Sequence, residues 1–125
     1  VCEVLLLAPA GQRAPVENEN RMTPPDLRAL KPTEVVMALS QLTGWSLSGD
    51  GAQIAIEKTF EFAQNSHTML FVNSLAWLSE KLQHHPELVL NARRCVVRWR
   101  THDVQGLSRL DFEAATQTDT LLPAA

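Results

Sequence analysis

Three of the chain's four histidines lie within residues 82–103, in the stretch LQHHPELVLNARRCVVRWRTHD. His84 and His85 are adjacent and precede Pro86, whereas His102 closes a run of arginines. Imidazoles titrate near neutral pH, so a group of them suits general acid/base catalysis of a proton-transfer reaction. Residue type and spacing therefore make His84, His85 and His102 candidate catalytic residues.

A carboxylate lies four residues before the first of these histidines. If one helix continues through both positions, Glu80 and His84 share a face and can touch. A carboxylate beside an imidazole fixes its tautomer and favours its protonated form. In the same intact helix, His85 would point about 100° away from His84. Glu80 is therefore a candidate supporting residue.

Other interpretations of these residues stay open. A histidine at a helix end can simply be a favourable charge on the helix dipole. An adjacent His-His pair is a weak metal signal, and no recognised ligand spacing with a fourth donor accompanies it, so we expect no metal site. The pattern Ser108-x-x-Asp111 is typical of a capping box, in which the acid satisfies helix backbone donors. His67, in the first turn of a predicted helix, is expected to have no chemical role.

The composition is that of a single globular domain. The chain has 125 residues, of which 45% are hydrophobic and 20% charged, and is long enough to bury a core. A net charge of -3 argues against a general nucleic-acid binder, and two cysteines, Cys2 and Cys95, are too few for a disulfide framework. The longest apolar run is too short to span a bilayer and lacks the basic residues that open a signal peptide. We therefore expect a cytoplasmic protein without nucleic-acid or membrane contacts.

The elements that must position the histidines follow from the hydrophobic periodicity. Residues 1–31, rich in Pro and Gly, predict a flexible arm, and residues 32–122 predict a folded domain. Thr33 can cap a first helix that Gly44 can end. A hairpin then turns around Gly49-Asp50-Gly51.

A second helix is predicted to begin at Asn65 or Ser66 and to stop before Pro86. Two strand-like stretches follow, and after Gly106 a last helix begins with Ser108 as its cap. The positions expected to face the core are Val35, Val36, Leu39, Leu42, Ile54, Ile56, Phe60, Phe62, Phe71, Leu75, Trp77, Leu78, Leu82, Cys95, Val97, Trp99 and Thr101. The order α-β-β-α-β-β-α favours an α+β fold with a four-stranded antiparallel sheet and three helices on one face.

Four segments, AIEKTFEF, FVNSLAWL, HHPEL and RTHDVQGLSRLDF, together resemble the pterin-4a-carbinolamine dehydratase family. The resemblance covers about residues 30–122. The positions in register with the family pattern are Glu80, His84, His85, Pro86, Thr101, His102, Gly106, Leu107 and Asp111. The resemblance implies the same fold, with the strands of two subunits joined into one sheet and dimers that often pair into tetramers.

The resemblance also implies an activity, the dehydration of 4a-hydroxytetrahydropterin to quinonoid dihydropterin in pterin recycling, with no metal or organic cofactor. The three matched histidines would hold the pterin and exchange protons with the leaving hydroxyl and the ring nitrogen. Glu80 and Asp111 would support them, and Pro86 and Thr101 would contact the substrate. Loss of water from a carbinolamine needs an acid for the oxygen and a base for the nitrogen proton, which agrees with the histidine cluster.

Several positions depart from the family pattern. Leu88 stands where many members have Trp, Ala92-Arg93 replaces an aromatic-Asn pair, and Gln105 replaces the first Gly of Gly-Gly-Leu. An aromatic wall stacks on a flat pterin, so its loss from the pocket predicts a weakened dehydratase.

The same departures support a second hypothesis, that of a non-catalytic adaptor. Dehydratase-like proteins include a RuBisCO assembly factor of α-carboxysomes and, in animals, a transcription-factor dimerisation partner. Arg94, Arg98 and Arg100 on one strand face would then grip an acidic protein surface, and the protein would be carboxysome-associated. The alternative for these arginines is a solvated or subunit-facing sheet edge.

Overall fold

The computed structural model describes residues 27–121, which form a four-stranded sheet and three α-helices. The helices are α1 (Pro32–Ser40), α2 (Asn65–Leu82) and α3 (Arg109–Asp119). The strands are β1 (Ser46–Ser48), β2 (Ala55–Glu61), β3 (Glu87–Asn91) and β4 (Arg94–Trp99), with short 3₁₀ turns η3 (Gly51–Gln53) and η4 (His102–Val104). The predicted order α-β-β-α-β-β-α is confirmed.

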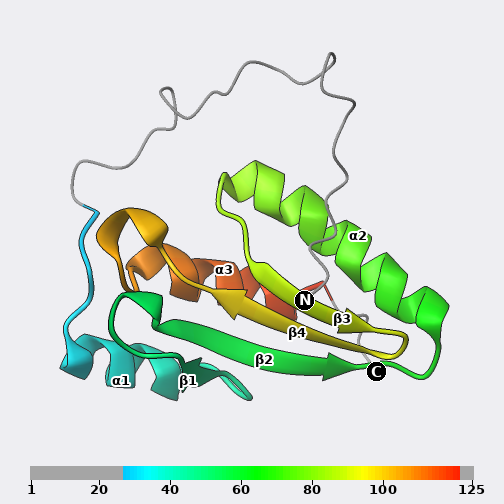
Figure 1. Cartoon of the computed structure of the whole chain (residues 1–125), viewed down its shortest axis with the longest axis horizontal. Helices are drawn as coiled ribbons and strands as arrows, with labels where there is room; N and C mark the ends of the chain where they lie inside the picture. The colour runs from blue at the N-terminus through cyan, green and yellow to red at the C-terminus, as the bar shows by residue number, and fades with distance from the viewer. Residues whose placement is uncertain (1–26, 122–125) are drawn as a thin grey trace, which may run out of the picture.

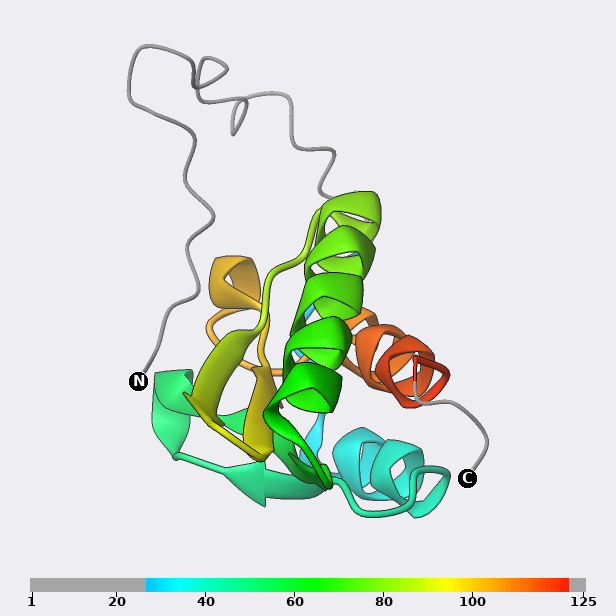
Figure 2. The same ribbon diagram turned by 90° about the vertical axis from the view of Figure 1, so that its right-hand side faces the viewer.

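The strands are all antiparallel to their neighbours and lie in the order β1-β2-β4-β3. Because β4 runs antiparallel to both β2 and β3, its C-terminal end lies beside the N-terminal ends of those two strands (Figure 1). The helices cover one face of the sheet, as predicted, which leaves its other face uncovered by any of them (Figure 2).

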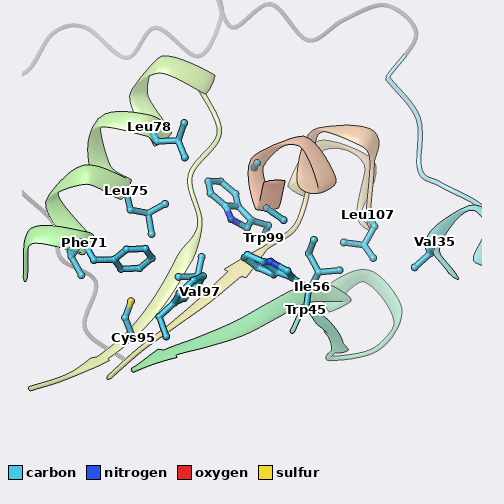
Figure 3. Close-up of a cluster of buried hydrophobic side chains, with 14 residues drawn as sticks. Val35, Trp45, Ile56, Phe71, Leu75, Leu78, Cys95, Val97, Trp99 and Leu107 are labelled. Atoms are coloured by element: carbon cyan, nitrogen blue, oxygen red, sulfur yellow. The ribbon is translucent and has the colours of Figure 1, made fainter. Parts of the chain in front are cut away.

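The core forms between β4 and the helices. Cys95, Val97 and Trp99 alternate along β4, and each is fully buried. They face a stripe of buried α2 residues, Phe71, Leu75 and Leu78 (Figure 3). The Trp99 indole Nε1–H donates to Thr118 Oγ1 of α3 at 3.1 Å, which satisfies the one polar atom of its ring. Burial raises the pKa of the Cys95 thiol to about 11, so Cys95 packs as a small apolar side chain.

Two residues that were predicted to face the core, Val36 from its helical spacing and Trp77 from its residue type, are exposed instead. Trp77 is 77% exposed and Val36 is 64% exposed. Each is adjacent in sequence to a buried residue, Leu78 or Val35. Neighbours in a helix point about 100° apart, and Val36 and Trp77 lie on the sides of their helices that are turned away from the buried stripes containing Val35 and Leu78. Both predictions were wrong for this reason.

Helix α1 starts earlier than predicted. Its first residue is Pro32, whose fixed φ suits the first helical position, and the Glu34 carboxylate accepts the Lys31 N–H at 2.9 Å. Thr33 therefore lies inside the helix and is not its cap. The helix ends at Ser40, before Gly44, which adopts φ 86° in the link to β1.

The folded domain also begins before residue 32. The Leu30 N–H donates to the Leu107 carbonyl at 2.7 Å, and the Leu30 side chain packs against the core. The rest of the predicted arm, residues 1–26 with Cys2, and the last predicted domain residue, 122, lie outside the described residues. No helix within residues 27–121 is long and apolar enough to cross a membrane.

Candidate active site

A surface cleft of about 640 Å³ opens where the end of β4 meets the starts of β2 and β3. Its lining consists of Ser48, Gly49, Gln53, Ala55, His85, Pro86, Glu87, Arg98, Arg100 and His102. Three of the predicted site residues, His85, Pro86 and His102, are thus brought together. They come from two segments that the antiparallel pairing of β3 with β4 places side by side.

His84 lies behind the cleft and is not part of its lining. Only 4% of the residue is exposed, and its ring stacks on the Trp99 indole with 5.2 Å between centroids. The Nε2–H donates to Asp111 Oδ1 at 2.6 Å. An ionised carboxylate can only accept, so beside an ionised Asp111 the ring carries a proton on Nε2. The predicted trio therefore splits into one buried and two exposed imidazoles.

Asp111 is a fully buried carboxylate that accepts three hydrogen bonds. Besides the His84 ring, the Thr101 hydroxyl donates to Oδ2 at 2.8 Å and the Ser108 N–H donates to Oδ2 at 3.0 Å. The Ser108 hydroxyl in turn accepts the Leu110 N–H at 3.2 Å, which confirms the predicted capping box. Asp111 therefore both caps α3 and holds His84.

The end of α2 explains why His84 turns inward. Gln83 adopts the left-handed conformation at φ 52°, ψ 38°, and the His84 N–H donates back to the Ser79 carbonyl, as in a Schellman motif. The helix is therefore not intact at His84, and the expected contact with Glu80 was wrong. Glu80 is exposed in the last turn, and among the described residues Asp111 is the carboxylate bound to His84.

The loop that carries His102 is closed from behind by Thr101. Thr101 is 1% exposed, and its N–H donates to the Gly106 carbonyl at 3.0 Å. Thr101 was predicted to contact the substrate, but it does not line the cleft. Its side chain is bonded to Asp111 instead. Gln105 adopts φ 52°, a left-handed conformation that favours Gly.

Ala92 and Arg93 form the β3–β4 turn, at the end of β4 opposite the cleft. The length of β4 places this turn about 17 Å from the cleft, at 3.3 Å per strand residue. The expectation that they line the pocket was therefore wrong for the cleft of this chain. The turn is tied to α2 instead, because the Thr68 hydroxyl donates to the Ala92 carbonyl at 2.9 Å.

Two of the three arginines proposed to grip a partner are paired within their own sheet. Arg98 Nε donates to Glu57 at 2.8 Å, and its Nη1 donates to Glu87 at 2.7 Å. Arg94 lies 3.6 Å from Glu61. The bond from Arg98 lowers the pKa of Glu57, and the two carboxylates raise the pKa of Arg98.

The lowered pKa of Glu57 predicts an acid-dependent loss of stability. Its contribution is fully present above the unfolded pKa, about 4.3, and is lost as the pH falls through the lower folded pKa. Glu57→Gln should therefore flatten the fall in unfolding free energy between roughly pH 5 and pH 3. Urea unfolding across this range checks it, with Glu61→Gln as the control on a longer, more exposed pair. An unchanged acid slope in Glu57→Gln contradicts the prediction.

The hairpin between β1 and β2 supplies the opposite wall of the cleft, a role that was not predicted from the sequence. Ser48, Gly49 and Gln53 come from this hairpin and line the cleft opposite the histidine segments. The only sequence signal was the turn-forming Gly-Asp-Gly, which predicts a hairpin but not what it lies against.

Gly49 is predicted to be essential to this wall. It adopts φ +70°, and a Cβ there would lie 2.5 Å from the Gln53 carbonyl oxygen. Gly51 also has positive φ, +56°, but a Cβ there would meet nothing within 4 Å. Gly49→Ala should lower the unfolding free energy by about 2–3 kcal/mol and Gly51→Ala by about 1 kcal/mol, the left-handed strain alone. Equal losses in urea unfolding would contradict the steric argument.

Comparison with known proteins identifies the family. Residues 28–121 match the family model described as pterin 4 alpha carbinolamine dehydratase. The chain belongs to this family. A relative from Paracidovorax citrulli (strain AAC00-1), provisionally named a pterin-4-alpha-carbinolamine dehydratase, is 52% identical over 98 residues, which are 78% of this chain and 84% of the relative. A relative with the same provisional name from Xanthomonas oryzae pv. oryzae (strain MAFF 311018) is 47% identical over 83 residues, which are 66% of this chain and 69% of the relative.

Solved structures share the fold of this pterin-4-alpha-carbinolamine dehydratase family member. A transcriptional coactivator/pterin dehydratase from Brucella melitensis aligns with TM-score 0.72 and 30% identity, over 77% of this chain and 100% of that one. A pterin dehydratase-like RuBisCO assembly factor of the α-carboxysome aligns with TM-score 0.56 and 20% identity, over 66% of this chain and 93% of that one. At that identity the second likeness shows the fold alone.

Proposed function

We propose that this protein dehydrates 4a-hydroxytetrahydropterin to quinonoid dihydropterin, with His85 and His102 as the acid/base residues. The observation that carries the proposal is the convergence of these two exposed imidazoles in one cleft, in a chain of the dehydratase family. Pro86 lies beside His85 in the same lining and would contact the substrate.

The reaction requires two proton transfers and no change in oxidation state. The bond between C4a and the hydroxyl oxygen breaks, and the oxygen leaves as water after receiving a proton from an acid. The ring nitrogen loses its proton to a base, and its electron pair forms the new C=N bond. An imidazole can serve as an acid or as a base near neutral pH, so the two histidines can supply both functions. The proposal therefore includes no metal or organic cofactor.

His84 and Asp111 support this chemistry from behind the cleft. The carboxylate holds the Nε2–H of His84, and Thr101, bonded to the same carboxylate, immediately precedes His102. A buried network of this kind fixes the loop and the ring on which the reacting groups depend. Asp111 is thus a positioning residue. Glu80 lies outside the cleft lining, and we assign it no proton-transfer role.

The adaptor hypothesis has less support from the geometry. Arg94 and Arg98 already contact carboxylates of their own sheet, so they have less free charge to offer an acidic partner. With this function we still expect a cytoplasmic location and a symmetric homo-oligomer. Light scattering of the purified protein tests the oligomeric state.

Stopped-flow decay of 4a-hydroxytetrahydropterin tests the proposed activity. We expect the decay rate to rise in proportion to protein concentration. A decay no faster than in buffer, measured with protein whose circular dichroism and unfolding transition show it to be folded, would reject the dehydratase and leave the adaptor.

A further inference from the structure

Arg100 is a cleft residue whose charge has no carboxylate partner. Its Nη1 donates to the Ala52 carbonyl at 3.3 Å, and among the ion pairs of residues 27–121 none involves Arg100. A guanidinium has five N–H donors, so most of them remain for another acceptor. Ala52 lies in η3, between β1 and β2. The bond to its carbonyl fixes the Arg100 side chain to the hairpin wall of the cleft.

The neighbouring arginine of the same face shows the contrast. Arg98 lies between Glu57 and Glu87, which bind two of its nitrogens and compensate its charge. The single Glu87 carboxylate of the cleft lining is therefore already bound, and Arg100 is the uncompensated charge. In a chain with net charge -3, this is a local positive site inside a cleft. Such a site attracts an anionic group of a ligand.

The position of Arg100 relative to the reacting groups sets where that anionic group would lie. Arg100 and His102 are two residues apart, on the cleft side of the chain as β4 ends. Two residues of extended chain span about 7 Å. A ring held at His102 would therefore reach Arg100 through a short side chain.

We propose that Arg100 binds an anionic substituent, a phosphate ester or a carboxylate, on the side chain of the pterin substrate. This inference rests on the proposed function, because it places the pterin ring at His85 and His102. Arginine binds phosphate and carboxylate oxygens through paired N–H donors, so it would distinguish an anionic substrate from a neutral one.

Calorimetric titration with three pterins that lack the 4a-hydroxyl, handled without oxygen, tests the inference. The probes are 7,8-dihydroneopterin, which has a neutral side chain, its 3′-phosphate, and 7,8-dihydrofolate, whose tail carries carboxylates. We expect the wild-type protein to bind at least one anionic probe about tenfold more tightly than the neutral one at low salt, with a smaller ratio at high salt. The two anionic arms show which group is preferred.

Three variants assign the preference to Arg100. Arg100→Gln should reduce the ratio of affinities to about one, and Arg100→Lys should retain part of it because it keeps the charge. Arg93→Gln makes the same charge change at the exposed β3–β4 turn and should leave the ratio unchanged. Equal binding of all three probes by the wild type, or a ratio unaffected by Arg100→Gln, overturns the inference but not the dehydratase. Failure to bind any pterin rejects the pterin site and the inference with it.

Discussion

Asp111→Ala is expected to lower the free energy of unfolding by about 3–5 kcal/mol, because it removes the acceptor that three buried donors share. The substitution leaves the His84 Nε2–H, the Thr101 hydroxyl and the Ser108 N–H without their common acceptor. Each buried donor left unbonded costs on the order of 1–3 kcal/mol. Denaturant unfolding followed by tryptophan fluorescence measures the loss, since Trp99 stacks on the His84 ring.

Two further variants serve as controls for Asp111→Ala. Asp103 is an exposed acid in η4, and Asp103→Ala should change the unfolding free energy by less than about 0.5 kcal/mol. Asp111→Asn keeps the shape of the side chain and allows activity to be measured if the alanine variant does not fold. An unfolding free energy of Asp111→Ala within about 0.5 kcal/mol of wild type would show that the network does not hold the site.

His85→Ala and His102→Ala are each expected to reduce kcat for carbinolamine dehydration by about a hundredfold or more. Both histidines are exposed in the cleft, so each variant should keep nearly the wild-type unfolding free energy, within about 0.5 kcal/mol. Stopped-flow rates and urea unfolding of the same preparations measure the two quantities. Activity loss without stability loss is the signature expected of residues that act on the substrate.

The other two histidines are the matched controls. His67 is exposed in the first turn of α2 and outside the cleft lining, so His67→Ala should keep both rate and stability. His84 is buried on Trp99 and bonded to Asp111, so His84→Ala should lose stability as well as rate. A rate of His102→Ala equal to that of His67→Ala would remove His102 from the mechanism.

The sheet and its helix-covered face could be predicted because burial dictates the period of the sequence. In β4 the buried Cys95, Val97 and Trp99 alternate with Arg94, Val96 and Arg98, and this period of two is visible without a structure. Helix faces were predicted less well. Trp77 and Val36 are large and apolar, yet they face outward. They were predicted wrongly because the size of an apolar side chain does not distinguish a core position from a surface one.

That His85 and His102 lie in one cleft could be predicted, because chain order and antiparallel pairing bring the two segments together. The partner of His84 could not be predicted. It depends on the left-handed conformation of Gln83, and glutamine is not a residue type that predicts this conformation. It also depends on how α3 packs behind β4. The carboxylates around Arg98 were missed for a similar reason, since they depend on the register between three strands.

The most direct test of the central claim is the stopped-flow decay of 4a-hydroxytetrahydropterin with wild type and with the double variant His85→Ala/His102→Ala. If the two cleft histidines perform the dehydration, wild type accelerates the decay of the substrate. With the folded double variant, the substrate then decays at the rate measured in buffer. A double variant as fast as wild type, or a wild type no faster than buffer, would contradict the assignment of dehydration to these histidines.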